Sequence, residues 1–146
     1  MHRRALIASS AVIISTSSGC IGDISFQSSS QVPLGEVKMT NMLEDELEAT
    51  IAVEKDDSRV YREKHELSGT ANGPAGNIEI RKEWMGEVAE YVVSVSINDG
   101  EMENSISSDD VNEMFSDWGD SDCFSASVIP EQHDVHFAIG SLETCP

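Results

Sequence analysis

A period of two, in which every second residue is apolar, is the feature that most constrains the fold. In the run Tyr91–Ile97 every second residue is large and apolar, and two of the three residues between them are Ser. The run Leu47–Val53 alternates in the same way. Successive side chains of a β-strand point to opposite faces, so a period of two predicts strands with one face in a core and the other in solvent. The sequence therefore predicts a sheet protein.

Turn-forming residues follow both runs. Asp56 and Asp57 lie after one run, and Asp99 and Gly100 lie after the other. Such residues tolerate the positive φ of tight hairpin turns, so we expect each run to pair with the segment that comes next. The expected strands are 37–41, 47–53, 60–67, 77–84, 90–98, 101–107, 123–129 and 135–139, and the apolar spacing at 108–115 predicts one short helix.

These elements predict an all-β fold in a single domain. Seven or eight short strands, with turns at close intervals, are typical of an antiparallel β-sandwich. A length of 146 residues is enough for one domain with its own core. We expect this domain at 35–146, with Trp84 and Tyr91 in a core of Val and Ile side chains.

The first part of the chain predicts export and anchoring. Arg3 and Arg4 precede an apolar stretch too short to cross a bilayer, which is the layout of a signal peptide at 1–19. The arginine pair indicates twin-arginine export. Cys20 lies where a lipobox is cleaved, so we expect lipid on its sulfur and a flexible Ser-rich tether at 20–34. An ordinary secretory signal that leaves Cys20 free is the alternative.

The three cysteines support this interpretation by their number. An odd count in an exported protein leaves one thiol over. If Cys20 carries lipid, Cys123 and Cys145 form an even pair, which we expect to be oxidised to a disulfide outside the membrane. Two buried free thiols are the alternative, and the spacing is not that of a zinc site.

The chain is strongly acidic. It holds 27 acidic and nine basic side chains, for a formal net charge of −18. Proteins that bind nucleic acid need clustered Lys and Arg against the phosphates, so we expect no nucleic-acid partner. Six of the basic residues lie at 55–82, and none lies at 83–146. We expect the six to make cross-strand ion pairs with the five acids of their own segment, and a face that meets a partner protein is the alternative.

Asp117, Asp120 and Asp122 form the candidate metal site. A hard cation such as Ca²⁺ takes several oxygen ligands from one loop, although the spacing is not that of an EF-hand and a solvated acidic loop is the alternative. We expect no metal at His133 and His136, because residues three apart on a strand point to opposite faces.

Motifs for catalysis are missing from the sequence. The chain has no GxSxG turn, no HExxH helix and no Gly-rich loop that leads into Lys-Ser or Lys-Thr. His65 stands alone on a charged strand, where we expect a surface histidine. We therefore expect no enzyme and no cofactor.

A family resemblance rests on several of these features together. The chain resembles exported acidic lipoproteins of halophilic archaea in its Arg3-Arg4 pair, in its lipobox-like sequence at Cys20, and in the runs EVKMTNMLEDELEATIAVEKDDSRVYREKHEL and EYVVSVSINDGE. The resemblance implies an immunoglobulin-like sandwich, anchored by lipid to the outer face of the cell membrane. It also implies a non-enzymatic structural or binding module whose partner is an unidentified surface protein or a small ligand. A lipoprotein that captures a ligand or cation with its acidic loop is the alternative.

High acidity is consistent with such a source. In molar salt the Debye length falls to about 3 Å, so that repulsion among the carboxylates is screened. In dilute buffer the same charge destabilises the compact state. We therefore expect the free energy of unfolding to rise with the concentration of NaCl or KCl.

Overall fold

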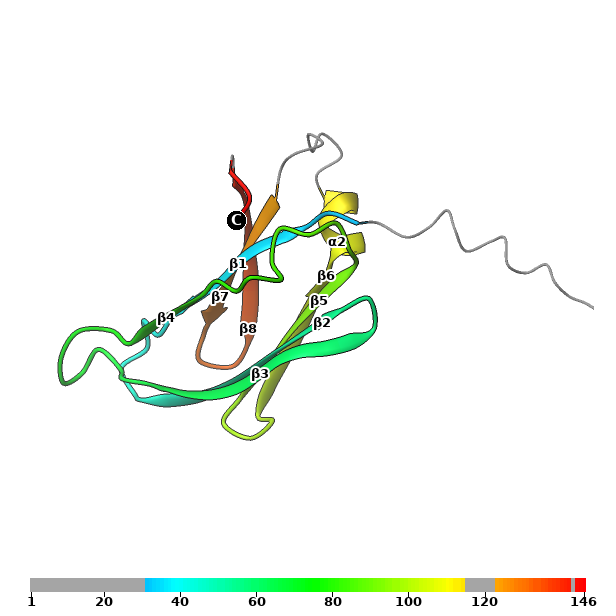
Figure 1. Cartoon of the computed structure of the whole chain (residues 1–146). Coiled ribbons are helices and arrows are strands. Elements are labelled where there is room, and N and C mark those ends of the chain that lie inside the picture. The colour runs from blue at the N-terminus through cyan, green and yellow to red at the C-terminus, as the bar shows by residue number, and fades with distance from the viewer. Residues whose placement is uncertain (1–30, 115–122, 143) are drawn as a thin grey trace, which may run out of the picture.

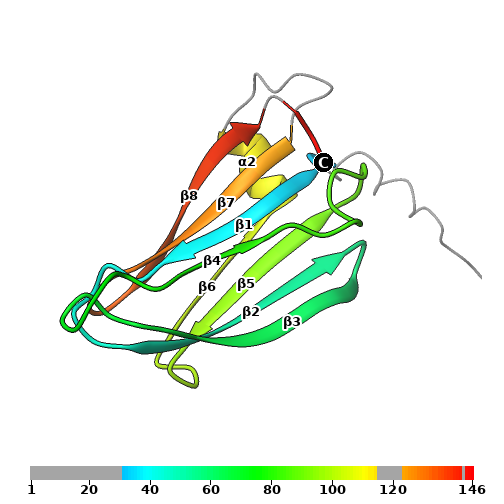
Figure 2. The same ribbon diagram turned by 60° about the vertical axis from the view of Figure 1, so that its left-hand side comes forward.

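Two four-stranded sheets pack face to face in the computed structural model, which describes residues 31–114, 123–142 and 144–146 (Figure 1 and Figure 2). The first sheet has the strand order β4-β1-β7-β8, and the second has the order β3-β2-β5-β6. The elements are β1 (Leu34–Thr40), β2 (Leu47–Lys55), β3 (Ser58–Leu67), β4 (Asn77–Ile80), β5 (Tyr91–Ile97), β6 (Met102–Ser107), α2 (Ser108–Met114), β7 (Cys123–Pro130) and β8 (Val135–Leu142).

The expected secondary structure corresponds closely to the observed one. Each of the eight expected strands is present in the described residues, and the expected helix is observed as α2. The strand expected at 77–84 is shorter, because β4 ends at Ile80 and Trp84 lies in the turns that follow. The prediction of an all-β sandwich is confirmed.

The strand order differs from the immunoglobulin order. That arrangement divides seven strands as ABED and CFG, so that its second and third strands lie in opposite sheets. Here β2 and β3 pair with each other in one sheet, and the immunoglobulin-like type is therefore not confirmed. The expectation of a wholly antiparallel sandwich is wrong at one pair, since β1 runs parallel to β7. Parallel neighbours need a long crossover connection, and the five strands between them provide it.

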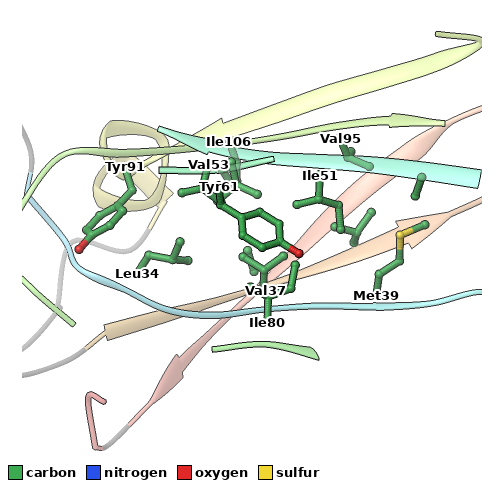
Figure 3. Packing of buried hydrophobic residues seen from close by; sticks show 14 of the residues in the cluster. Leu34, Val37, Met39, Ile51, Val53, Tyr61, Ile80, Tyr91, Val95 and Ile106 are labelled. Atoms are coloured by element: carbon green, nitrogen blue, oxygen red, sulfur yellow. The ribbon is translucent and has the colours of Figure 1, made fainter. Parts of the chain in front are cut away.

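The core lies between the sheets and is formed by alternate residues of each strand. The alternating apolar side chains of β2 and β5 are at most 4% exposed. Figure 3 shows Ile51 of β2 on one side of the core and Val37 of β1 on the other. Tyr91 is fully buried, whereas Trp84 is only partly buried and stacks on it with ring centroids 6.4 Å apart. Burial of this apolar surface is the main favourable term in folding.

The two ends of the sandwich are built differently. The tether end holds the start of β1 at Leu34, the turn at 56–57, the segment 81–90 and α2 (Figure 2). The loop end holds the connections that follow β1, β3, β5 and β7, which are residues 41–46, 68–76, 98–101 and 131–134. A chain that enters at Leu34 therefore presents four connections at the opposite end.

A buried amide orders the loop end. The side chain of Asn41 is fully buried just after β1, and its Nδ2 donates to the carbonyl oxygens of Asp45, Leu67 and Ser68 at 2.8, 3.2 and 3.2 Å. Its Oδ1 accepts from the N–H of Leu43 at 3.0 Å. Buried polar groups are costly unless they are hydrogen-bonded, so this one amide holds the 41–46 connection against the end of β3.

Replacing Asn41 should therefore destabilise the whole sandwich. We expect Asn41→Ala to lower the free energy of unfolding by about 2–3 kcal/mol, because several backbone groups lose their partner at once. The exposed Asn77 of β4 supplies the control, and Asn77→Ala should change the stability by less than about 0.5 kcal/mol. Urea unfolding in molar KCl measures both variants, and equal midpoints for the two would contradict the role given to Asn41.

Candidate functional site

The residues singled out for export and metal binding lie outside the described part of the chain. They are Arg3, Arg4, Cys20, Asp117, Asp120 and Asp122. Within residues 31–114, 123–142 and 144–146, no group of three or more His, Cys, Asp or Glu side chains is placed to hold a metal ion. The same ranges contain no helix that is long and apolar enough to cross a membrane.

The two cysteines of the domain are joined in a disulfide, as the sequence predicted. Cys123 begins β7, and its Cα atom lies 5.5 Å from that of Cys145. Gly35 of β1 allows this close packing, because a Cβ there would lie 3.0 Å from the Cβ of Cys123 and 2.5 Å from the side chain of Leu142. The crosslink thus ties residue 145 to the first sheet at the tether end.

The acidic residues that begin α2 have a structural role at one position. The N–H of Asp110 donates to the Ser107 hydroxyl at 3.2 Å, and the Asp110 carboxylate accepts from the Ser107 N–H at 2.9 Å. This reciprocal arrangement is a capping box, which satisfies the free N–H groups at a helix start. Asp110 therefore has a structural role, which is to cap the start of α2.

The histidines do not converge. His133 lies exposed in the 131–134 connection, and His136 on β8 contacts Glu131 and Asp134 at 2.7 and 3.4 Å. His65 was expected at the surface, but it is partly buried, with its Nε2 3.0 Å from the hydroxyl of Tyr61. Tyr61 lies four residues before His65 on the same face of β3, and its contact with the ring explains why His65 is partly buried.

The basic segment at 55–82 makes ion pairs, mostly with acids from outside it. Lys64 contacts Glu48 at 3.3 Å, Lys55 contacts Glu87, and Arg81 reaches Glu36. The expected pairing with acids of the same segment is therefore wrong for these bases, because their partners come from strands and turns outside it. Among the described ion pairs, only that of Arg81 with Glu79 lies within the segment.

Sequence reasoning missed a buried carboxylate on the first sheet. Glu36 of β1 is 1% exposed, on the face of the sheet turned away from the core. Its oxygens accept from Arg81 at 2.6 and 3.0 Å, from the Ser125 hydroxyl at 3.0 Å and from Lys38 at 3.0 Å. Burial raises the pKa of this carboxyl, but the bonds from Lys38, Ser125 and Arg81 outweigh it, so that the pKa lies below its ordinary value.

The lowered pKa predicts a stability that is lost in acid. A carboxyl with a depressed folded-state pKa stabilises the fold above its unfolded pKa of about 4.3, and this contribution disappears as the pH falls through the folded-state pKa. We expect Glu36→Gln to cost about 2 kcal/mol at pH 7, and its deficit relative to the parent to shrink below about pH 4. Urea unfolding at both pH values measures the difference.

The matched control for Glu36 is Glu79, which is half-exposed on β4 and contacts the same guanidinium at 2.8 Å. Glu79→Gln should cost less than about 1 kcal/mol, as is usual for exposed ion pairs. A Glu36→Gln variant with the same pH profile as the Glu79→Gln variant would show that the buried carboxylate is not the stabilising group.

A second carboxylate at the tether end has the opposite electrostatics. Burial raises the pKa of Glu90, and the charges of Asp109, Asp57 and Asp56 raise it further. The N–H of Glu90 donates to the Asp56 carboxylate at 3.0 Å, so the backbone itself holds these side chains together. Like charges held at this turn destabilise the folded state whenever all of them are ionised.

This repulsion predicts a stabilising substitution. Because the folded-state pKa of Glu90 is raised, its penalty is absent below the unfolded pKa, grows as the pH rises through the folded-state pKa, and is fully present at pH 7. We expect Glu90→Gln to raise Tm by about 2 °C at pH 7 in dilute buffer. The gain should become smaller in molar KCl, which screens the Asp charges but not the cost of burial, and it should vanish at pH 3.5. Glu101→Gln, in the exposed 98–101 turn, is the control. A gain of the same size in dilute buffer and in molar KCl would contradict the contribution of the neighbouring Asp charges.

The loop end is the candidate binding surface. Met42 is 70% exposed although the loop that carries it is tied down by Asn41. A hollow of about 460 Å³ lies beside it, and both apolar and acidic side chains line this hollow. Exposed apolar groups ringed by carboxylates suit a partner with apolar and basic side chains. Lining residues include Met42, Leu43, Glu44, Glu101, Met102 and His133.

Comparison with known proteins adds no identification. The chain matches no model of a protein family, no curated protein and no solved structure.

Proposed function

We propose that this protein is a non-enzymatic module that lipid on Cys20 holds at the outer face of the cell membrane, after export directed by Arg3 and Arg4. The observation that carries the proposal is the disulfide between Cys123 and Cys145, which takes two of the three cysteines. Disulfides persist in oxidising compartments outside the cytoplasm. The remaining cysteine is the one in the sequence context of lipid attachment.

The shape of the domain supports a binding role for its loop end. The tether would join the sandwich at Leu34, so the connections 41–46, 68–76, 98–101 and 131–134 would face away from the membrane. This end carries the exposed Met42 and the hollow of about 460 Å³. An unidentified surface protein or a small ligand would bind there.

The charge supports a habitat of high salt. Cleavage after residue 19 removes two arginines and leaves a net charge of −20 on the mature chain. The raised pKa of Glu90 is one place where this acidity costs stability unless salt screens it. An exported lipoprotein of a halophilic archaeon would experience that screening.

Lipid attachment is tested in a halophilic archaeal host. We expect the intact mass of the mature chain to correspond to residues 20–146 plus lipid, and the protein to fractionate with membranes. Cys20→Ser should abolish the added mass and release the protein from the membrane fraction, because a two-chain anchor holds far more firmly than any residual contact. Ser28→Ala, within the proposed tether, is the control and should stay with the membrane. A Cys20→Ser variant that remains in the membrane fraction would refute the anchor.

A further inference from the structure

One of the four edge strands lacks the usual protection against pairing. The first sheet ends at β4 and β8, and the second ends at β3 and β6. β3 has the sequence SRVYREKHEL with five charged residues, β6 contains Glu103, and β4 is only four residues long. β8 has eight residues, VHFAIGSL, with no Asp, Glu, Lys or Arg. Charge and shortness are the means by which proteins block edge-to-edge contact, and β8 has neither.

In β8, alternate residues direct their backbone N–H and C=O toward the free edge of the sheet, away from β7. The first of these residues is Val135, and both of its backbone groups already have partners. Val135 pairs with Pro130, which has no N–H and therefore cannot donate to the Val135 carbonyl. The N–H of Val135 donates instead to the Asp134 carboxylate at 2.8 Å, and its carbonyl accepts from the Asn104 side chain of β6 at 2.9 Å. The backbone groups of Val135 therefore point away from β7.

The next two residues that direct their backbone groups toward the free edge are Phe137 and Ile139. An antiparallel ladder alternates, so Phe137 and Ile139 also direct their N–H and C=O away from β7. No hydrogen bond within the described ranges uses these four groups. A Cβ at Gly140 would meet nothing within 4 Å, and a hollow of about 430 Å³ separates Phe137 from β6 and α2. Figure 2 shows β8 as the outermost strand of its sheet.

Because β8 carries no Asp, Glu, Lys or Arg, it is the edge at which a second copy of this chain meets the least repulsion. Two molecules of this acidity repel each other over most of their surfaces. β8 lets two copies approach with no carboxylate directly opposite another along the central residues of the strand. Glu131 and Asp134 lie against His136 near the start of the strand, and Asp110 and Glu113 line the hollow beside Phe137.

We propose that β8 pairs with β8 of a second copy, antiparallel, about a two-fold axis beside Ala138. Phe137 then lies opposite the partner's Ile139, and Ile139 lies opposite the partner's Phe137. Each of these pairs exchanges two backbone hydrogen bonds, which satisfies all four open groups on each copy. The two sheets become one continuous sheet of eight strands, β4-β1-β7-β8 followed by its two-fold copy.

The side chains fit this register on both faces. On the inner face an aromatic ring meets a β-branched side chain, which is a favourable cross-strand pair, and both residues are only partly buried in one copy. On the outer face Ala138 meets Ala138, and His136 meets Gly140. Small residues at the axis therefore allow close approach of the backbones.

The pairing is expected to be weak and to strengthen with salt. A single strand pair buries less than the roughly 1,200 Å² of a stable interface, so we expect a Kd of about 10 µM to 1 mM. Molar KCl screens the repulsion between the two acidic domains and should tighten the dimer. The pairing does not depend on the lipid anchor, and failure of either proposal leaves the other standing.

A cysteine placed at the axis tests the register. In the proposed dimer the two Ala138 Cα atoms are about 4.5 Å apart, within the range that a disulfide spans, whereas two Gly140 Cα atoms are about 14 Å apart. Every chain in this test also carries Cys20→Ser, so that no other free thiol is present. We expect Ala138→Cys of the full chain, oxidised in 2 M KCl, to give a covalent dimer on a non-reducing gel, and peptide mapping to find the link at 138. Gly140→Cys and the parent should stay monomeric. Equal crosslinking of Ala138→Cys and Gly140→Cys, or no dimer, would overturn the proposal.

A charge placed at the axis tests the same contact without a crosslink. Ala138 is exposed, so Ala138→Lys should fold normally while setting two like charges opposite each other in the dimer. Sedimentation equilibrium of the parent in 2 M KCl should show a mass that rises toward the dimer, and Ala138→Lys should remain monomeric. Asn77→Lys, on the opposite edge of the same sheet, should dimerise like the parent. A parent that stays monomeric at 1 mM refutes self-pairing, even if β8 binds a strand of another protein.

Discussion

The first sheet depends on β1, because this strand joins its two halves. β1 pairs antiparallel with β4 on one side and parallel with β7 on the other. Its Glu36 binds Arg81, which follows β4, and Ser125, which lies on β7, so one carboxylate links three strands. These partners lie 45 and 89 residues away in the chain. A buried charge without partners is costly, and the cluster is therefore stable only once the whole sheet has formed.

Acidity shapes the rest of the surface around that sheet. Several bases contact acids of other strands or turns, as Lys64 contacts Glu48 of β2, and these contacts offset part of the repulsion among the carboxylates. At the tether end burial and the charges of Asp109, Asp57 and Asp56 raise the pKa of Glu90, and the backbone bond to Asp56 keeps the carboxylates close. The surroundings of Glu36 thus favour its ionised form, whereas the surroundings of Glu90 disfavour the ionised form. Salt concentration decides how much the second matters.

Local patterns in the sequence predicted the strands, but they did not predict contacts between residues that lie far apart in the chain. The period of a strand and the backbone conformation of a turn depend on adjacent residues. The alternation at Tyr91–Ile97 therefore predicts a strand, and Asp99 and Gly100 predict the turn that follows it. Asn98 and Asp99 do adopt positive φ at that turn. Nothing adjacent to Glu36 distinguishes it from the other acids of the chain. Its burial follows from the parallel pairing of β1 with β7, which no local pattern in the sequence indicates.

The same limit applies to the candidate sites. The pairing of Cys123 with Cys145 could be predicted, because the number of cysteines leaves few alternatives. The ordering role of Asn41 could not, since its three carbonyl partners come from the 41–46 connection and from the end of β3, which meet only in the folded domain. Met42 owes its fixed, exposed position to that neighbour rather than to any property of its own.

The tether end, the loop end and the edge strand β8 occupy different parts of the domain. Their positions limit how two anchored copies could be oriented on a membrane. A two-fold axis beside Ala138 runs normal to the first sheet and reverses the strand direction, so the tether ends of two copies point opposite ways. Both copies reach one membrane only if the sheet lies parallel to it. The 14 residues from Cys20 to Pro33 span at most about 50 Å when extended, which is longer than the thickness of a sandwich of two sheets about 10 Å apart. Pairing through β8 would then leave both loop ends free at the sides of the dimer, whereas a single copy would be free to stand upright on its tether.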